Sequence, residues 1–165
     1  MKVAIVGSNG LIGRALGRAL VDRGDSVVAL SRGGSSGIAG ALDMRWDPAE
    51  GPPPAAALEG GDAVVNLAGV PIGGKRWTAD RKREIRESRT LTTRALVDAM
   101  TGEGGPRVLV NGSAVGYYGD TGNRIADETA PPGRGFLAQL CRDWEAATAP
   151  AQHAGARVVL TRTGL

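Results

Sequence analysis

Short apolar runs and segments with helical spacing alternate along the whole chain. Runs rich in β-branched residues are typical of buried strands and lie at residues 3–6, 26–30, 42–46, 62–67, 107–111 and 157–161. Apolar residues with helical spacing lie at residues 14–20, 55–58, 77–100 and within 135–152. Thr78 is expected to cap the longest of these helices. Strand and helix alternate five or six times, which with right-handed crossovers predicts an α/β fold: a doubly wound parallel sheet in three α/β/α layers.

A glycine turn joins the first predicted strand to the first predicted helix. Gly7, Gly10 and Gly13 stand between the apolar run at 3–6 and the helical segment at 14–20. Glycine lets the backbone turn sharply and approach a pyrophosphate closely, and a helix N-terminus presents unpaired N–H groups to an anion. This strand–turn–helix order predicts dinucleotide binding. The alternative, a tight turn with no ligand, accounts for one glycine better than for three.

The residues after the second strand indicate which dinucleotide is bound. An acidic residue there would bind the ribose 2′-hydroxyl of NAD, whereas an arginine accommodates the 2′-phosphate of NADP. Arg32 takes that place, directly after Ser31, so the sequence favours NADP over NAD. The alternative is that Arg32 is a solvated charge in the Gly/Ser-rich loop at residues 33–40.

Four segments follow predicted strands and should meet in one crevice, because ligands bind outside the carboxyl ends of the strands in a doubly wound sheet. They begin at Gly7, Ser31, Leu67 and Ser113. The residues expected to contact the cofactor are Gly7, Ser8, Asn9, Gly10, Leu11, Ile12, Ser31, Arg32, Leu67, Ala68, Gly69 and Ser113.

Composition narrows the range of functions. The 165 residues suit one domain, and 42% apolar and 22% charged residues are ordinary for a globular chain. The net charge of +3 comes mostly from scattered arginines, so no nucleic-acid surface is expected. Cys141 and His153 are the only cysteine and histidine, which argues against a disulfide framework, a metal site and a Ser-His-Asp triad. With no apolar run near ~20 residues and no signal peptide before Met1, we expect a cytoplasmic protein away from membranes.

Several further strings resemble the extended short-chain dehydrogenase/reductases, and more narrowly an NAD-dependent epimerase/dehydratase branch that includes SulA-like cell division inhibitors. Besides the glycine turn, they are NLAG at 66–69, RW at 76–77, SR at 88–89, GSAVGYYG at 112–119, FLAQLC at 136–141, WE at 144–145 and RTG at 162–164. The resemblance covers the whole chain. It implies a nucleotide-binding Rossmann domain over residues 1–165 with NADP as its cofactor.

The resemblance also implies a catalytic tyrosine with a lysine four residues further on. The lysine lowers the pKa of the tyrosine, so that the phenol can exchange a proton during hydride transfer. The corresponding helix of this chain carries Phe136 and Leu140, or Leu137 and Cys141 one residue on. Neither pair supports that chemistry.

The catalytic hydroxyl of the family precedes a Tyr-Gly pair and aligns here with Ala114, one residue after Ser113. The expected catalytic residues are therefore Ser113, which would touch substrate or nicotinamide, and Tyr118 as a substitute proton donor. The alternative is that Tyr117 and Tyr118 only pack beside the nicotinamide.

Two functions remain open. The first is an NADP-dependent oxidoreductase or epimerase acting on a small or sugar-nucleotide-like substrate. The second is a non-catalytic NADP-binding sensor or scaffold, which the missing Tyr/Lys pair favours. The resemblance implies a longer architecture with a C-terminal substrate lobe, and that lobe is expected to be absent here. Apolar surface near Val158 and Leu160 should then be exposed, or hidden in a homo-oligomer.

Overall fold

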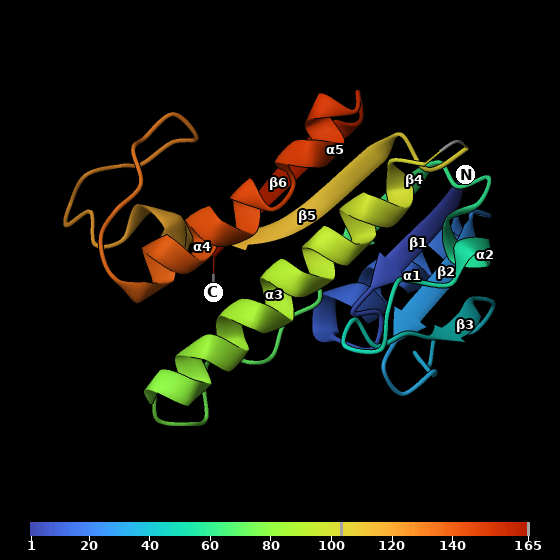
Figure 1. The fold of residues 1–165 in the computed structure, drawn as a ribbon, viewed down its shortest axis with the longest axis horizontal. Helices are drawn as coiled ribbons and strands as arrows, with labels where there is room; N and C mark the ends of the chain where they lie inside the picture. Colours follow the sequence, from blue (N-terminus) through green and yellow to red (C-terminus); the bar gives the residue numbers. More distant parts are fainter. Residues whose placement is uncertain (103, 165) are drawn as a thin grey trace.

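A computed structural model describes residues 1–102 and 104–164 as one parallel sheet with helices on both faces (Figure 1). The six strands lie in the order β3-β2-β1-β4-β5-β6. They are β1 (Lys2–Val6), β2 (Ser26–Ser31), β3 (Leu42–Arg45), β4 (Ala63–Asn66), β5 (Val108–Ala114) and β6 (Arg157–Thr163). The chain runs outward from β1 to β3, returns to β4 beside β1, and runs outward again to β6. The strand order therefore reverses between β1 and β4.

The helices divide between the two faces of the sheet. They are α1 (Leu11–Asp22), α2 (Ala55–Leu58), α3 (Ala79–Met100), α4 (Phe136–Ala146) and α5 (Ala149–His153), with a 3₁₀ turn η1 at Val115–Tyr118. Leu20 of α1 packs against Ile5 and Val27 on one face, whereas Leu96 of α3 packs with Val64 on the other. The predicted three-layer doubly wound sheet is confirmed. Within the described residues, no helix is long and apolar enough to cross a membrane.

Strand burial follows from position in the sheet. β1 and β2 are buried at nearly every residue because both of their faces are covered, which is why they read as continuous apolar runs. At the edge, β6 is only partly covered: Val158 packs against the core, while Leu160 is 37% exposed. Of the two apolar positions expected at the surface, Leu160 is exposed and Val158 is not.

The longest helix begins where it was predicted, whereas the helical segment predicted within residues 135–152 is interrupted. Thr78 caps α3, because its hydroxyl accepts a hydrogen bond from the backbone N–H of Arg81 at 3.2 Å. The helical segment within 135–152 is two helices, since α4 ends at Ala146 and α5 begins at Ala149. Pro150 stands in the first turn of α5, where a helix does not need the missing N–H.

A buried hydrogen-bond network joins β4, β5, α3 and α4. The Asn66 side-chain nitrogen donates to Thr93 Oγ1 at 2.9 Å and to Asn111 Oδ1 at 2.7 Å. The indole N–H of Trp144 donates to the same Thr93 hydroxyl at 3.0 Å. Asn66, Thr93 and Asn111 are fully buried, so these contacts replace water for every group involved. The network fixes where α3 and α4 stand over the carboxyl ends of β4 and β5.

Removing the Thr93 hydroxyl should therefore destabilise the fold more than removing a similar hydroxyl elsewhere on α3. In Thr93→Val, the indole N–H of Trp144 loses its hydrogen-bond acceptor, and the Asn66 amide loses one of its two acceptors. The free energy of unfolding, measured by urea denaturation, should therefore fall by about 1–3 kcal/mol. Thr90→Val is the matched control, because the buried Thr90 hydroxyl bonds only the carbonyl of Arg86 in its own helix. Equal losses in the two variants would contradict a role for the network.

Candidate functional site

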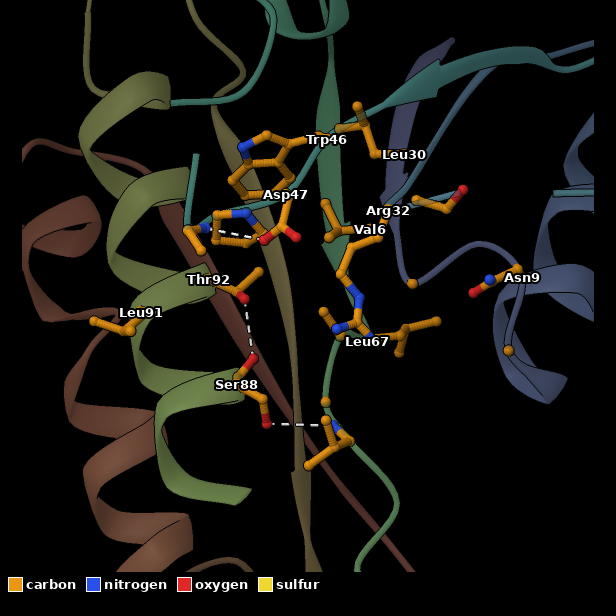
Figure 2. A pocket seen from close by; sticks show the side chains of 18 of the residues that line it. Val6, Asn9, Leu30, Arg32, Trp46, Asp47, Leu67, Ser88, Leu91 and Thr92 are labelled. Carbon is orange, nitrogen blue, oxygen red and sulfur yellow. Dashed lines mark hydrogen bonds between the residues drawn. The ribbon is translucent and has the colours of Figure 1, made fainter. Parts of the chain in front are cut away.

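A cleft of about 390 Å³ opens at the carboxyl ends of β1, β2 and β4 (Figure 2). One wall is formed by the turns after these strands, and the other by α3. The lining includes residues 6–7, 9–10, 30–32, 46–49 and 67–70, and Glu84, Glu87, Ser88, Leu91 and Thr92 of α3. The cleft therefore lies at the reversal of strand order, where doubly wound folds bind their ligands.

The glycine turn brings three pieces of backbone together at the cleft. Gly7 has a φ of +79°, and a Cβ there would lie 2.9 Å from the carbonyl carbon of Leu67. A Cβ on Gly13 would lie 2.4 Å from the carbonyl oxygen of Gly7. Gly10 precedes α1, and no side chain caps the helix there. The N-terminus of α1 is therefore free to face an anion, in agreement with the reading of all three glycines.

Arg32 brings a positive charge into the cleft. Figure 2 shows its side chain extending toward Leu67, and both residues line the cavity. On the opposite wall, the hydrogen bond from Arg81 holds the pKa of Glu84 below its usual value, and the charges of Lys75 and Arg32 lower it further. Arg32 and Glu84 thus give the cleft one positive and one negative side chain on its two walls.

Eight of the residues predicted to contact a cofactor line this cleft: Gly7, Asn9, Gly10, Ser31, Arg32, Leu67, Ala68 and Gly69. Ser8 instead turns into the core, where its hydroxyl donates to the carbonyl of Leu30 at 3.2 Å. Leu11 is 90% exposed and lines a second hollow that shares Asn9 and Gly10 with the cleft, and Ile12 is also exposed. Ser113 likewise lies outside the lining of the cleft.

Ser113 belongs to a network of charged and polar groups beside α4. Its hydroxyl donates to Glu145 Oε1 at 2.6 Å. Arg162 donates to both carboxylate oxygens of Glu145, at 2.8 and 2.9 Å, and its Nη1 donates to the Tyr118 hydroxyl at 2.9 Å. The Arg162 guanidinium also lies 3.6 Å from the centroid of the Tyr117 ring. The two residues predicted to be catalytic, Ser113 and Tyr118, are therefore joined through a shared ion pair.

The ion pair in this network places one positive and one negative side chain beside the Ser113 and Tyr118 hydroxyls. The hydrogen bonds to Glu145 are the main cause that raises the pKa of Arg162, so the guanidinium stays charged. α4 itself carries neither tyrosine nor lysine. On the same helix, burial raises the pKa of the Cys141 thiol, and Sγ lies 3.7 Å from the carbonyl oxygen of Ala114.

Sequence reasoning missed part of the cleft and both residues of the ion pair. Trp46 and Asp47 line the cleft directly after β3, so the strand-end rule that found Arg32 could have found them. Ser88 donates to the carbonyl of Ile85 and accepts from the N–H of Val70 at 3.2 Å, which holds the segment after β4 against α3. Glu145 and Arg162 lie in different elements, and no pattern in the sequence around either residue indicates that they form an ion pair.

A parallel sheet of this order, with a glycine turn and a cleft at its reversal point, defines the Rossmann class of α/β proteins. The chain belongs to the NAD dependent epimerase/dehydratase family, whose family model matches residues 3–164.

Relatives of the chain are also named as epimerases or epimerase family proteins. An epimerase family protein of Mycobacterium leprae is 47% identical over 163 residues, which are 99% of this chain and 52% of that protein. The crystal structure of human epimerase family protein SDR39U1 with NADPH is 34% identical, with a TM-score of 0.82 over 99% of this chain and 54% of that one. A nucleoside-diphosphate sugar epimerase from Corynebacterium glutamicum is 40% identical, with a TM-score of 0.82 over 99% of this chain and 34% of that one. The chain spans about half the length of the curated relatives it matches.

The Glu145–Arg162 pair should matter more for stability than an exposed pair of similar geometry. The Arg162 and Glu145 side chains are only 18% and 10% exposed. Glu145→Gln would leave the guanidinium without its partner charge and should lower the free energy of unfolding by about 3–5 kcal/mol in urea denaturation.

Glu50→Gln is the matched control. Arg45 also donates to both oxygens of Glu50, but the two side chains are 57% and 56% exposed, so the loss should stay below ~1 kcal/mol. If Glu145→Gln were as stable as Glu50→Gln, water would be replacing the lost carboxylate as the partner of the Arg162 guanidinium.

Proposed function

We propose that this chain binds NADP(H) in the cleft and is the nucleotide-binding part of an NADP-dependent oxidoreductase or epimerase. The observation that carries the proposal is that the glycine turn and Arg32 line the same cleft. NADPH in the related human structure and the sugar-nucleotide substrate class in the name of the Corynebacterium relative support it. A small or sugar-nucleotide-like compound is the proposed substrate.

The residues of the cleft fit such a cofactor. The absence of side chains at Gly7 and Gly10 lets the turn pack tightly against the segment after β4, so that its backbone and the uncapped N-terminus of α1 could approach a pyrophosphate at the cleft. Arg32 would pair with the 2′-phosphate, and an aspartate would repel it. The segment Leu67–Gly69 would lie along the ribose and nicotinamide side.

Bound NADP(H) would supply hydride exchange, and residues of this chain would handle the proton. Tyr118 accepts a hydrogen bond from Arg162, so its own hydroxyl proton is free for a substrate oxygen. Arg162 would stabilise the negative charge that develops on Tyr118 when this proton leaves. Ser113 donates to Glu145, which leaves its oxygen free to accept a hydrogen bond from substrate.

A non-catalytic NADP-binding sensor or scaffold is the second candidate. The observation in its favour is that α4 carries Phe136 and Leu140, or Leu137 and Cys141 one residue on, instead of the Tyr/Lys pair. In that case NADP occupancy would change the affinity for a partner while no hydride is transferred. The SulA-like branch, a cytoplasmic location, a homo-oligomer and the absence of nucleic-acid binding remain predictions.

Thermal unfolding with each cofactor tests the binding proposal. NADP at about 100 times its dissociation constant should stabilise the protein by about 2.7 kcal/mol, and NAD should stabilise it less. Arg32→Asp should lose the response to NADP, because the new carboxylate repels the 2′-phosphate. Arg107→Asp is the control, since Arg107 is exposed at the opposite end of the sheet, just before β5. Equal stabilisation of Arg32→Asp and wild type by NADP would refute the assignment of Arg32.

Turnover distinguishes the two candidate functions. In the catalytic case, either NADPH consumption with a panel of carbonyl compounds or cofactor-dependent isomerisation of a panel of sugar nucleotides, followed by NMR of the products, should be detectable. Tyr118→Phe should then lower kcat by about 10²-fold or more while cofactor affinity is retained. The matched variant is Tyr117→Phe, which keeps the ring beside Arg162 and should remain active. Cofactor binding without any turnover on the panel would favour the sensor.

A further inference from the structure

Arg89 is a half-buried cation to which the proposed function gives no role. It lies on α3, where its Nη1 donates to the carbonyl of Ile85 at 3.0 Å and its Nη2 to the carbonyl of Val70 at 3.2 Å. A longer contact of 3.5 Å joins Nη1 to the Ser88 hydroxyl. All three acceptors are neutral.

No carboxylate pairs with Arg89 among residues 1–102 and 104–164. Its neighbours differ in this respect, because Arg86 pairs with Asp143 and Arg162 with Glu145. Burial is the main cause that lowers the pKa of Arg89, the Cys141 thiol opposes this shift, and the charge of Arg81 adds to it. A guanidinium taken out of water without an anion is unfavourable for folding, so its presence here calls for an anion from outside the chain.

The guanidinium is held in place by its neighbours. A Cβ on Gly69 would lie 2.8 Å from Cζ of Arg89, so the guanidinium packs directly against the backbone of this glycine. On its other side, Cζ lies 5.2 Å from the centroid of the Trp144 ring. Nε has no acceptor within the described chain, yet it is not sealed from solvent as Nε of Arg81 is. Arg89 is therefore rigid and still offers N–H groups to a ligand.

Arg89 lies between the cleft and the Ser113 network. Gly69, Val70 and Ser88, which it contacts, all line the cleft. In the other direction, the Arg89 guanidinium lies over the ring of Trp144, the residue before Glu145, whose carboxylate accepts the hydrogen bond from Ser113. A ligand that reaches from the cleft toward Ser113 would pass the free donors of Arg89.

We propose that Arg89 is the anion-binding group of the substrate pocket, and that the substrate carries a carboxylate or phosphate group close to its reacting carbon. This inference rests on the proposed function. The planar guanidinium would form charge-assisted hydrogen bonds to the oxygens of that group. The substrate charge would then complete an ion pair that the protein leaves incomplete.

Anion-dependent thermal unfolding tests the proposal. The titration compares four proteins: wild type, Arg89→Gln, Arg89→Lys and Arg94→Gln. Each is titrated with sodium phosphate or sodium pyruvate, and sodium chloride of equal ionic strength is the reference salt. Saturating NADP is present, so that the phosphate-binding positions of the cofactor are filled. Arg94 is the matched control because it is an exposed arginine on the same helix.

Wild type and Arg94→Gln should gain stability with phosphate, pyruvate or both, and the anion that acts identifies the group on the substrate. Arg89→Gln should weaken the apparent anion affinity about ten-fold or more, with Arg89→Lys in between. In chloride, Arg89→Gln should be at least as stable as wild type, because an unpaired buried charge is removed. A purely structural arginine predicts the opposite: a lower melting temperature that is the same in every salt, which would overturn the proposal. An unchanged anion response in Arg89→Gln would overturn it too.

The same titration without NADP separates this proposal from the proposed function. If NADP stabilises none of the variants, the cofactor assignment fails, yet the difference between wild type and Arg89→Gln in phosphate or pyruvate is still measurable. If Arg32→Gln loses the NADP response and keeps the Arg89-dependent anion response, the two sites are distinct and both assignments hold.

Discussion

The close contact of three backbone segments around Gly7 is the constraint on which the cleft depends. The N–H of Gly7 donates to the carbonyl of Leu30 at 3.2 Å, which ties the end of β1 to β2, and the N–H of Leu67 donates to Val6, which ties it to β4. α1 starts directly beside this junction because Gly13 has no side chain to separate it from Gly7. A side chain at either glycine would push apart the segments that line the cavity.

A second constraint concerns charge at the far side of the cleft. The buried network around Thr93 fixes the positions of α3 and α4. Each of these helices carries one charged residue of the region: Arg89 lies on α3 and Glu145 on α4. Glu145 of α4 neutralises Arg162, whereas Arg89 of α3 meets only neutral acceptors. The fold thus presents one arginine with a carboxylate partner, beside the Tyr118 hydroxyl, and one without such a partner within the described residues, over the Trp144 ring.

Much of the fold and part of the site could be predicted from local patterns. Arg32 and the glycine turn were found because the end of a parallel strand is recognisable from its apolar run. Ser8 stands in the same turn but points into the core, because its hydroxyl finds the carbonyl of Leu30 on the neighbouring strand. The break between α4 and α5 was missed, since Ala147 and Thr148 carry no strong stop signal and Pro150 is compatible with a first helical turn.

The sequence by itself determined the alternation of strands and helices, the turn at Gly7 and the cap at Thr78. Each of these depends on the backbone preferences or hydrophobic period of one continuous segment. Only the tertiary structure decided that α3 forms a wall of the cleft, that Glu145 neutralises Arg162, and that Arg89 has no such partner. These are contacts between elements far apart in the chain, and their geometry is set by how helices pack on the sheet rather than by any local pattern.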